Sequence, residues 1–481
     1  MLRSLFIIAM LTALLSSRGQ AQSEPLLTGI SGVTRGKLVL TIPPDRPPHG
    51  SLRYSLAFPF QVGPQTMGIM ALRMIHETHN YGYLAGTDVI LLDELKPPHP
   101  DQIFAISRNE MEPVKAGATP RIRCKGPLMG GFVPLGALRA DGSPHPHAGT
   151  GFGACDAHSR SFPDNRFVSG DPTHVATNEC FQFAYDGKKF TSRRTRSWSQ
   201  DEKEPYPIGD TGWTIQVIQL TYAIPDEDDL LIPSIAARID GSAKAVGVVR
   251  WKRVAGDWQP VEFDPVVSSQ NPHPKEPGCP WTEPSLARDA DGALLFSARG
   301  DDCLKDEAPR LGYTLRVWRS TKPGQWDLLF NDPQARLNSP VSVNVAADGS
   351  AYLVSSPYDV AFIPETGKSG RGREKLVLWP LTGSRTGLER ALLIRDCLAD
   401  FGAPTAQTLA GTELPEKWMA DHPNGVTVRL KDGQWHHLLA YRLCHSPRWT
   451  SYGTPPSPHT GSYLEEVTTR GPQIPTWNFA K

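Results

Sequence analysis

Glu283 and Arg299 are an acid and a base that the sequence places opposite each other on one predicted β-hairpin. The hairpin turns at Ala290-Asp291-Gly292, with Gly292 in the left-handed conformation, so residues at equal distances from Asp291 face each other. A planar guanidinium can bind a substrate carboxylate through two charge-assisted hydrogen bonds, and a carboxylate beside it stays ionised. We therefore predict that this pair is part of a site. The alternative is an ion pair that only stabilises its hairpin.

Cys279 and Cys303 occupy facing positions at the open end of the same hairpin. The register predicts a disulfide between them, for which a chain-entropy estimate gives roughly 3 kcal/mol. The chain has seven cysteines, so at least one of them has no partner within the chain.

Asp-Gly turns flanked by apolar runs recur along the chain, at Asp141, Asp186, Asp240, Asp291, Asp348 and Asp432. Repeated units of roughly 40 to 50 residues, each with a hairpin of short strands, are typical of a β-propeller. The 43 glycines and 45 prolines also fit a turn-rich, all-β protein. The sequence therefore predicts an all-β propeller with six or seven blades.

The predicted organisation has four parts. Residues 1–21 form a secretory signal peptide, with Arg3 before a short apolar run and Ala21 at the cleavage site. Residues 22–124 form an irregular N-terminal segment that can supply a first blade and a closing strand. Residues 125–452 form the propeller, and residues 453–481 a C-terminal strap. We expect a secreted or periplasmic protein that does not insert into a membrane after cleavage, because the apolar run is too short to span one.

The same register count in the other repeats finds one more pair, Asn178 opposite Arg194, at equal distances from Asp186. A purely structural repeat has no need of a polar residue facing an arginine. We therefore add Asn178 and Arg194 to the candidate substrate-binding residues. The net charge of zero gives no reason to expect a nucleic acid partner.

Histidines form a second group of candidates, with His145 and His147 close together and His422 in a distant repeat. A neutral imidazole can accept or donate a proton near pH 7. His145 and His147 could also bind a metal, but a third ligand at a firm spacing is missing. The acidic run Asp226-Glu-Asp-Asp229 could hold calcium, but it lacks the alternating spacing of a calcium loop. No cofactor is therefore expected.

Three segments carry a resemblance to a known family. Thr282-Glu-Pro-Ser-Leu286, then Asp291-Gly292, then Ala298-Arg299 resembles the fourth blade of the sialidase superfamily. Ser320-Thr-Lys-Pro-Gly-Gln-Trp326 is similar to a degenerate Asp-box of that family. Gly372-Arg-Glu-Lys-Leu376 is similar to the segment that carries another arginine of its carboxylate-binding triad. The resemblance implies a sialidase-like β-propeller.

The resemblance also implies roles for individual residues. Glu283 would polarise the nucleophile, and Arg299 and Arg373 would be two of the three arginines that bind the carboxylate. The family's first arginine has no counterpart in the matching stretches Phe132-Val-Pro134 and Leu231-Ile-Pro233. The position of its nucleophilic tyrosine matches Asn424.

Three functions follow as hypotheses. The first is a glycoside hydrolase that acts on an acidic sugar of a glycan or oligosaccharide, with Glu283 and His422 as catalytic residues. The second is a polysaccharide lyase on the same propeller, in which a histidine removes the proton next to a uronate carboxylate. The third is a propeller that binds glycans without catalysis. In each, Glu283, Arg299, Arg373 and Asn424 are expected around one end of the central channel, with His422 beside Asn424.

Overall fold

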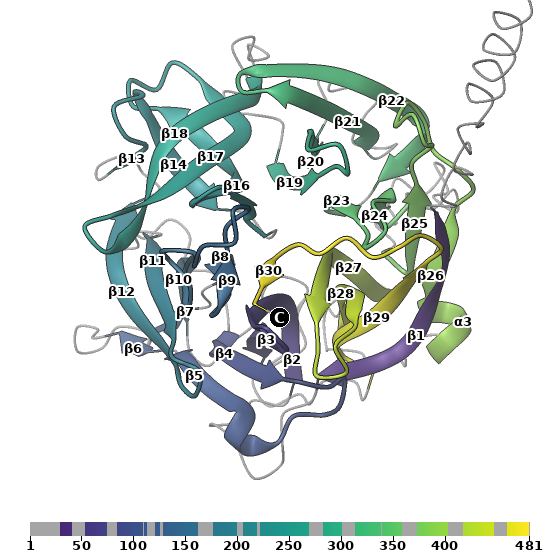
Figure 1. Ribbon diagram of the computed structural model, residues 1–481, viewed down its shortest axis with the longest axis horizontal. Coiled ribbons are helices and arrows are strands. Elements are labelled where there is room, and N and C mark those ends of the chain that lie inside the picture. Colours follow the sequence, from purple (N-terminus) through teal and green to yellow (C-terminus); the bar gives the residue numbers. More distant parts are fainter. Residues whose placement is uncertain are drawn as a thin grey trace, which may run out of the picture.

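The protein is a ring of β-sheets around a central channel (Figure 1). This computed structural model describes residues 29–40, 53–74, 84–108, 110–112, 121–125, 128–161, 177–199, 205–218, 222–268, 282–300, 313–337, 339–357, 373–402, 417–446 and 459–480. These residues form six blades, so the predicted all-β propeller is confirmed. No helix among them is long and apolar enough to span a membrane.

The first three blades follow one another along the chain. Blade 1 is β2 (Arg53–Gly63), β3 (Thr66–Met74), β4 (Leu84–Leu92) and β5 (Ile103–Arg108), with the short helix η1 (Pro100–Gln102) before β5. Blade 2 is β8 (Leu128–Val133), β10 (Thr150–Ser161), β11 (Thr177–Tyr185) and β12 (Phe190–Ser199), and β6 (Glu110–Glu112) and β7 (Arg121–Lys125) extend its sheet. Blade 3 is β13 (Tyr206–Pro207), β14 (Trp213–Ile218), β15 (Ile224–Asp226), β16 (Asp229–Arg238), β17 (Lys244–Val254) and β18 (Asp257–Ser268).

The last three blades complete the ring. Blade 4 is β19 (Thr282–Arg288), β20 (Leu294–Arg299), β21 (Tyr313–Lys322) and β22 (Gln325–Leu337). Blade 5 is β23 (Ser342–Val345), β24 (Ala351–Ser355), β25 (Lys375–Pro380) and β26 (Leu392–Asp396), followed by α3 (Cys397–Phe401). Blade 6 is β27 (Lys417–Arg429), β28 (Trp435–Ser446) and β29 (Gly461–Thr469), and β1 (Ile30–Leu40) from the N-terminal part pairs with β29 as its outer strand.

Apolar side chains hold each blade against both of its neighbours. Alternation along a strand sends successive side chains to opposite faces of the sheet. In blade 4, Leu286 and Phe296 pack against blade 3, while Ala287 and Leu295 pack against blade 5. Six such clusters of buried residues fill the six contacts between blades, the one between blades 6 and 1 included. The ring is therefore closed by burial on both faces of every sheet.

The six Asp-Gly turns share one geometry. Each glycine has a positive φ between +74° and +96°, where other residues are strained. Each aspartate accepts a hydrogen bond of 2.8–3.1 Å from the backbone N–H two residues further on. The repeat seen in the sequence is therefore a repeated turn in the structure, because a short carboxylate side chain can stabilise the turn that it begins.

The turns also define the two ends of the channel. Asp291, Asp348 and Asp432 follow the inner strands β19, β23 and β27, so they lie at one end, the turn end. The first residues of those strands lie at the other end, the start end. The C-terminal segment crosses the turn end, where the Gly471 N–H donates to Asp348 Oδ2 (3.2 Å) and β30 (Asn478–Phe479) pairs with β9 (Ala137–Leu138) (Figure 1).

Candidate functional site

Two inner strands contain the same irregularity. Glu283 in β19 and His422 in β27 have φ values of +51° and +52°, and a proline follows each of them. The strand pairing shifts at both places, between Thr282 and Ser285 and between Asp421 and Asn424. Such β-bulges re-aim side chains and are frequent beside active sites. The sequence therefore places two chemically active side chains on bulges at the start end of the channel.

Glu283 and Arg299 form an ion pair of 2.9 Å, and about a fifth of each side chain is exposed. The predicted register holds from Ser285, which faces Ser297, to the turn. At the start of β19 it was wrong by one residue, because the bulge at Glu283 makes Thr282 face Arg299. The two charged side chains meet in spite of that shift.

Asp421 lies at the centre of a buried group of charges in blades 5 and 6. Its side chain has no exposed surface, and it forms ion pairs with Arg373 and with Arg442, the latter through two contacts of 2.8 and 2.9 Å. Burial alone would raise the pKa of Asp421, but Arg442, His422 and Arg373 hold the pKa of this carboxyl well below its usual range. Asp421 is therefore an anion at neutral pH.

His422 joins this group to Glu283. Its Nδ1 lies 2.9 Å from Asp421 Oδ1. Burial lowers the pKa of His422 below its ordinary value, whereas the negative charges of Asp421 and Glu283 oppose that decrease. The imidazole is therefore neutral at pH 7, and Glu283 is close enough to influence it electrostatically.

We call these six side chains the rim cluster: Glu283, Arg299, Arg373, Asp421, His422 and Arg442. Within the cluster, Arg299 pairs with Glu283, and Arg373 and Arg442 pair with Asp421. Sequence reasoning missed Asp421 and Arg442. Arg442 faces Asp421 across β27 and β28, a pairing that a register count without the bulge does not find.

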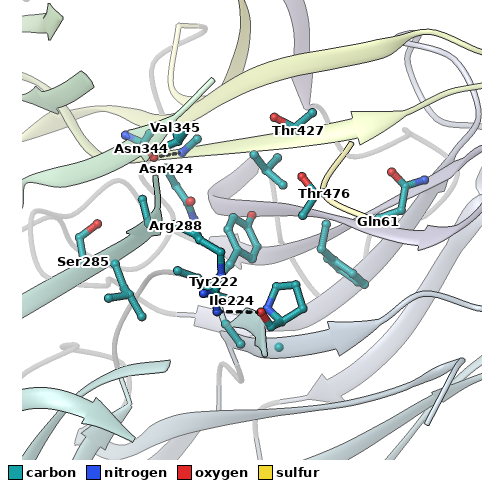
Figure 2. Close-up of a pocket in the computed structure, with 18 of the residues that line it drawn as sticks. Gln61, Tyr222, Ile224, Ser285, Arg288, Asn344, Val345, Asn424, Thr427 and Thr476 are labelled. Atoms are coloured by element: carbon teal, nitrogen blue, oxygen red, sulfur yellow. Dashed lines mark hydrogen bonds between the residues drawn. The ribbon is translucent and has the colours of Figure 1, made fainter. Parts of the chain in front are cut away.

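The channel also contains a cavity of about 170 Å³, whose lining residues include none of the six side chains of the rim cluster. Its wall takes residues from one inner strand of each blade, and Thr476 and Trp477 of the C-terminal segment close it at the turn end. Asn424, two residues after His422, belongs to this wall (Figure 2). The structure thus brings Asn424 beside His422, between the rim cluster and the cavity.

Asn178 and Arg194 lie away from this site, on the outer strands β11 and β12 of blade 2. The predicted pairing between them was wrong. Asn178 faces Trp198, because Asp186 is the first rather than the central residue of the turn and the register shifts once more between Cys180 and Phe181. Arg194 instead forms an ion pair of 3.1 Å with Glu179. The repeated Asp-Gly turns in the sequence do not show which hairpin of a blade contains each turn.

His147 also lies apart from the rim cluster. It precedes β10, in the loop where His145 contacts the ring of Trp477 in the C-terminal segment, at the turn end. Burial lowers the pKa of both histidines. The described residues contain no group of three or more His, Cys, Asp or Glu side chains that could hold a metal ion. In the acidic run, Asp226 and Asp229 form ion pairs with Arg250, at 2.7 and 2.9 Å.

Cys279 and Cys303 lie outside the described residues, so the disulfide between them stays a prediction.

Neither a scan against protein-family models nor a search of curated proteins finds a match. Solved structures similar to this chain include a protein of unknown function from Dyadobacter fermentans (11% identity, TM-score 0.46, 91% of this chain and 100% of that one). They also include a sialidase from Trypanosoma rangeli (11% identity, TM-score 0.43, 92% of this chain and 58% of that one). A third is an α-L-arabinanase from Penicillium chrysogenum bound to arabinobiose (9% identity, TM-score 0.43, 92% of this chain and 98% of that one). At these TM-scores the similarity carries no argument about family or activity.

Proposed function

We propose that the protein is a glycoside hydrolase that binds an acidic sugar residue of a glycan at the rim cluster and cleaves its glycosidic bond. The observation that supports this most directly is the gathering of three guanidinium groups near a buried, neutral His422. Such a site attracts an anion and holds a group that can transfer a proton. Asn424, two residues after His422, also lines a cavity in the channel.

Arg299 is the arginine of the cluster that we assign to the substrate carboxylate. Its Nη1 donates to Glu283 at 2.9 Å, and its planar guanidinium has the geometry to bind a carboxylate through two parallel hydrogen bonds. Arg373 and Arg442 are more deeply buried and hold Asp421. They add positive charge from below, which strengthens the binding of an anion in a site of low polarity.

Proton transfer is assigned to His422. Asp421 faces its Nδ1, which favours a proton on that nitrogen and leaves Nε2 as the atom that exchanges protons with a substrate. Glu283, which pairs with Arg299, is assigned to stabilise positive charge developing on the sugar during bond cleavage. General acid–base transfer of this kind contributes about 10²- to 10⁴-fold to a rate.

A polysaccharide lyase is the second candidate, and the lowered pKa of His422 favours it. A neutral imidazole is a base at pH 7, and it could remove the proton next to a uronate carboxylate while Arg299 neutralised that carboxylate. The same side chains thus serve two reactions that differ in their products. Glycan binding without turnover is the third outcome.

Incubation with sialyllactose, oligogalacturonate and hyaluronan oligosaccharides separates the three. New reducing ends without absorbance at about 235 nm would support the hydrolase, because hydrolysis does not form the unsaturated uronate that absorbs at this wavelength. Absorbance at that wavelength would support the lyase. Binding without either product would overturn both catalytic assignments. The His422→Gln protein, purified in the same way, is the control for a contaminating enzyme.

We also propose that the protein is exported, from the signal-like residues 1–21. Sequencing the N-terminus of the mature protein tests this, since export predicts that it begins at Gln22.

A further inference from the structure

Ala420 is the residue before Asp421 and His422, and blade 5 holds both polar groups of its backbone. The Ala420 N–H donates to the backbone oxygen of Arg373 at 2.7 Å. Its carbonyl oxygen accepts a hydrogen bond from the hydroxyl of Ser356, also at 2.7 Å. Ala420 lies in β27 of blade 6, whereas Ser356 follows β24 and Arg373 precedes β25 in blade 5 (Figure 1). The neighbouring blade therefore fixes the backbone that leads into the bulge.

Ser356 is in turn held from within blade 5. It has no exposed surface, and its N–H donates to the hydroxyl oxygen of Ser339 at 2.9 Å. Ser339 precedes Pro340 at the start of an inner strand, just as Glu283 and His422 precede prolines in blades 4 and 6. Unlike those two residues, Ser339 is fully buried. Blade 5 therefore uses this position to support Ser356.

His422 needs support because its backbone conformation is strained. A φ of +52° is uncommon for a residue with a side chain, and it persists only where the surrounding structure enforces it. The ion pairs with Arg373 and Arg442 hold the tip of the Asp421 side chain, about which the backbone can still pivot. The two hydrogen bonds of Ala420 hold that backbone. Together these contacts define where the imidazole lies.

We propose that Ser356 is a positioning residue for His422. Its hydrogen bond to Ala420 holds the imidazole where Nδ1 faces Asp421, and so determines which nitrogen exchanges protons with the sugar. Without that bond the bulge can relax, the imidazole moves away from Asp421, and neither neutral tautomer is strongly preferred. This inference deepens the proposed function and rests on it, because it assumes that His422 transfers the proton.

Nitrogen-15 NMR of the histidine side chains tests the positioning without any substrate. A protonated and an unprotonated ring nitrogen give well-separated signals, and the His422→Gln protein identifies those of His422 among the 14 histidines. At about pH 8, where the imidazole is neutral, we expect a proton on Nδ1 in the unmodified protein. In Ser356→Ala the two signals should move toward each other, because loss of one hydrogen bond shifts such an equilibrium by about 2- to 10-fold.

Steady-state kinetics tests whether the positioning matters for turnover. The substrate is whichever of sialyllactose, oligogalacturonate and hyaluronan oligosaccharides the protein cleaves. Ser356→Ala should lower kcat about 10-fold and leave KM within about 2-fold, because it misplaces His422 and leaves Arg299 in place to bind the carboxylate. Ser356→Cys keeps the shape of the side chain and a weak donor, so its kcat should lie between those of the other two proteins.

Ser320→Ala is the matched control. Ser320 is buried in blade 4, and its hydroxyl donates to the backbone oxygen of Lys322 at 2.5 Å, at the turn between β21 and β22. Like Ser356→Ala, this substitution removes one buried hydroxyl that bonds to a carbonyl. We therefore expect a similar decrease in melting temperature, with unchanged His422 signals and unchanged kcat.

The outcomes separate the two proposals. If the protein cleaves an acidic glycan and Ser356→Ala keeps its His422 signals or its kcat, the positioning role is wrong and the proposed function stands. If kcat falls only in proportion to unfolded protein, Ser356 is structural and the inference is overturned. If the unmodified protein cleaves none of the three glycans, the proposed function fails, while the His422 signals of Ser356→Ala still decide whether the serine holds the imidazole. Ser356→Cys takes the place of Ser356→Ala in both measurements if the alanine variant does not fold.

Discussion

Glu283 and His422 hold the same backbone conformation in two different blades. Their φ values are +51° and +52°, each precedes a proline, and each is the bulged residue of an inner strand. A positive φ is uncommon for any residue with a side chain, and a following proline restricts the backbone further. Conformations of this kind cost about 1–3 kcal/mol each and persist at functional sites. The two blades therefore use strained backbone to turn a carboxylate and an imidazole toward the start end of the channel.

Glycine should be tolerated better than alanine at both bulges. Glu283→Gly and Glu283→Ala remove the same carboxylate, but glycine adopts a positive φ without strain, so the Gly variant should be more stable by about 1 kcal/mol. Chemical denaturation measures the difference. At Ala287, in the regular part of the same strand, substitution by glycine should instead cost about 0.5–1 kcal/mol. Equal stabilities for the two Glu283 variants would mean that the bulge is not strained.

Arg299→Lys should lower turnover of an acidic glycan about 10- to 100-fold, since lysine keeps the charge and loses the two-pronged geometry. Glu283→Gln should also lower turnover while it leaves sugar binding largely intact. Steady-state kinetics on purified variants provides the measurement. If both substitutions lower the melting temperature and activity per folded molecule is unchanged, the pair is only structural.

Asp421→Asn should be strongly destabilising. It leaves Arg373 and Arg442 buried beside a neutral amide, and removing one partner of a buried ion pair costs about 3–5 kcal/mol. Asp257→Asn is the control, because Asp257 pairs with Arg193 at the surface, where an ion pair is worth less than about 1 kcal/mol. Urea denaturation compares them, and similar losses for both variants would contradict the central role of Asp421.

The pH dependence of activity should reflect His422. Its pKa is lowered in the folded protein, so the imidazole stays mostly neutral until the pH falls below 6.5. If the neutral form acts as the base, kcat/KM should be flat near pH 7 and should fall only on the acid side, with an apparent pKa below 6.5. The unfolded chain takes up the proton first, so the contribution to stability is present above pH 6.5 and is lost as the pH decreases toward the folded pKa. An activity decrease that begins above pH 7 would point to another group.

The disulfide between Cys279 and Cys303 can be tested by peptide mapping of the native exported protein without reduction. We expect one linked pair and, on reduction, a loss of roughly 3 kcal/mol. Alkylation of both thiols in unreduced protein would exclude the bond.

The fold could be predicted from the sequence because its signal is local. Each Asp-Gly turn needs only a carboxylate, a glycine and the next two residues, so the six turns are visible in the chain. Consecutive apolar residues such as Leu286 and Ala287 likewise predict that both faces of the strand are buried. The pair of Glu283 and Arg299 was found for the same reason, since both lie on one hairpin.

The rest of the site was decided by tertiary structure. Arg373 reaches Asp421 from another blade, and no spacing along the chain encodes this contact. The bulges at Glu283 and His422 shifted the strand register, so counting from a turn could not find Arg442 or place Thr282. The sequence by itself determined the turns, the two-faced strands and the hairpin pair, because these depend on near neighbours. Only the closed ring decided which charged side chains meet in the rim cluster, because closure of the ring brings strands that are distant in sequence together at the start end of the channel.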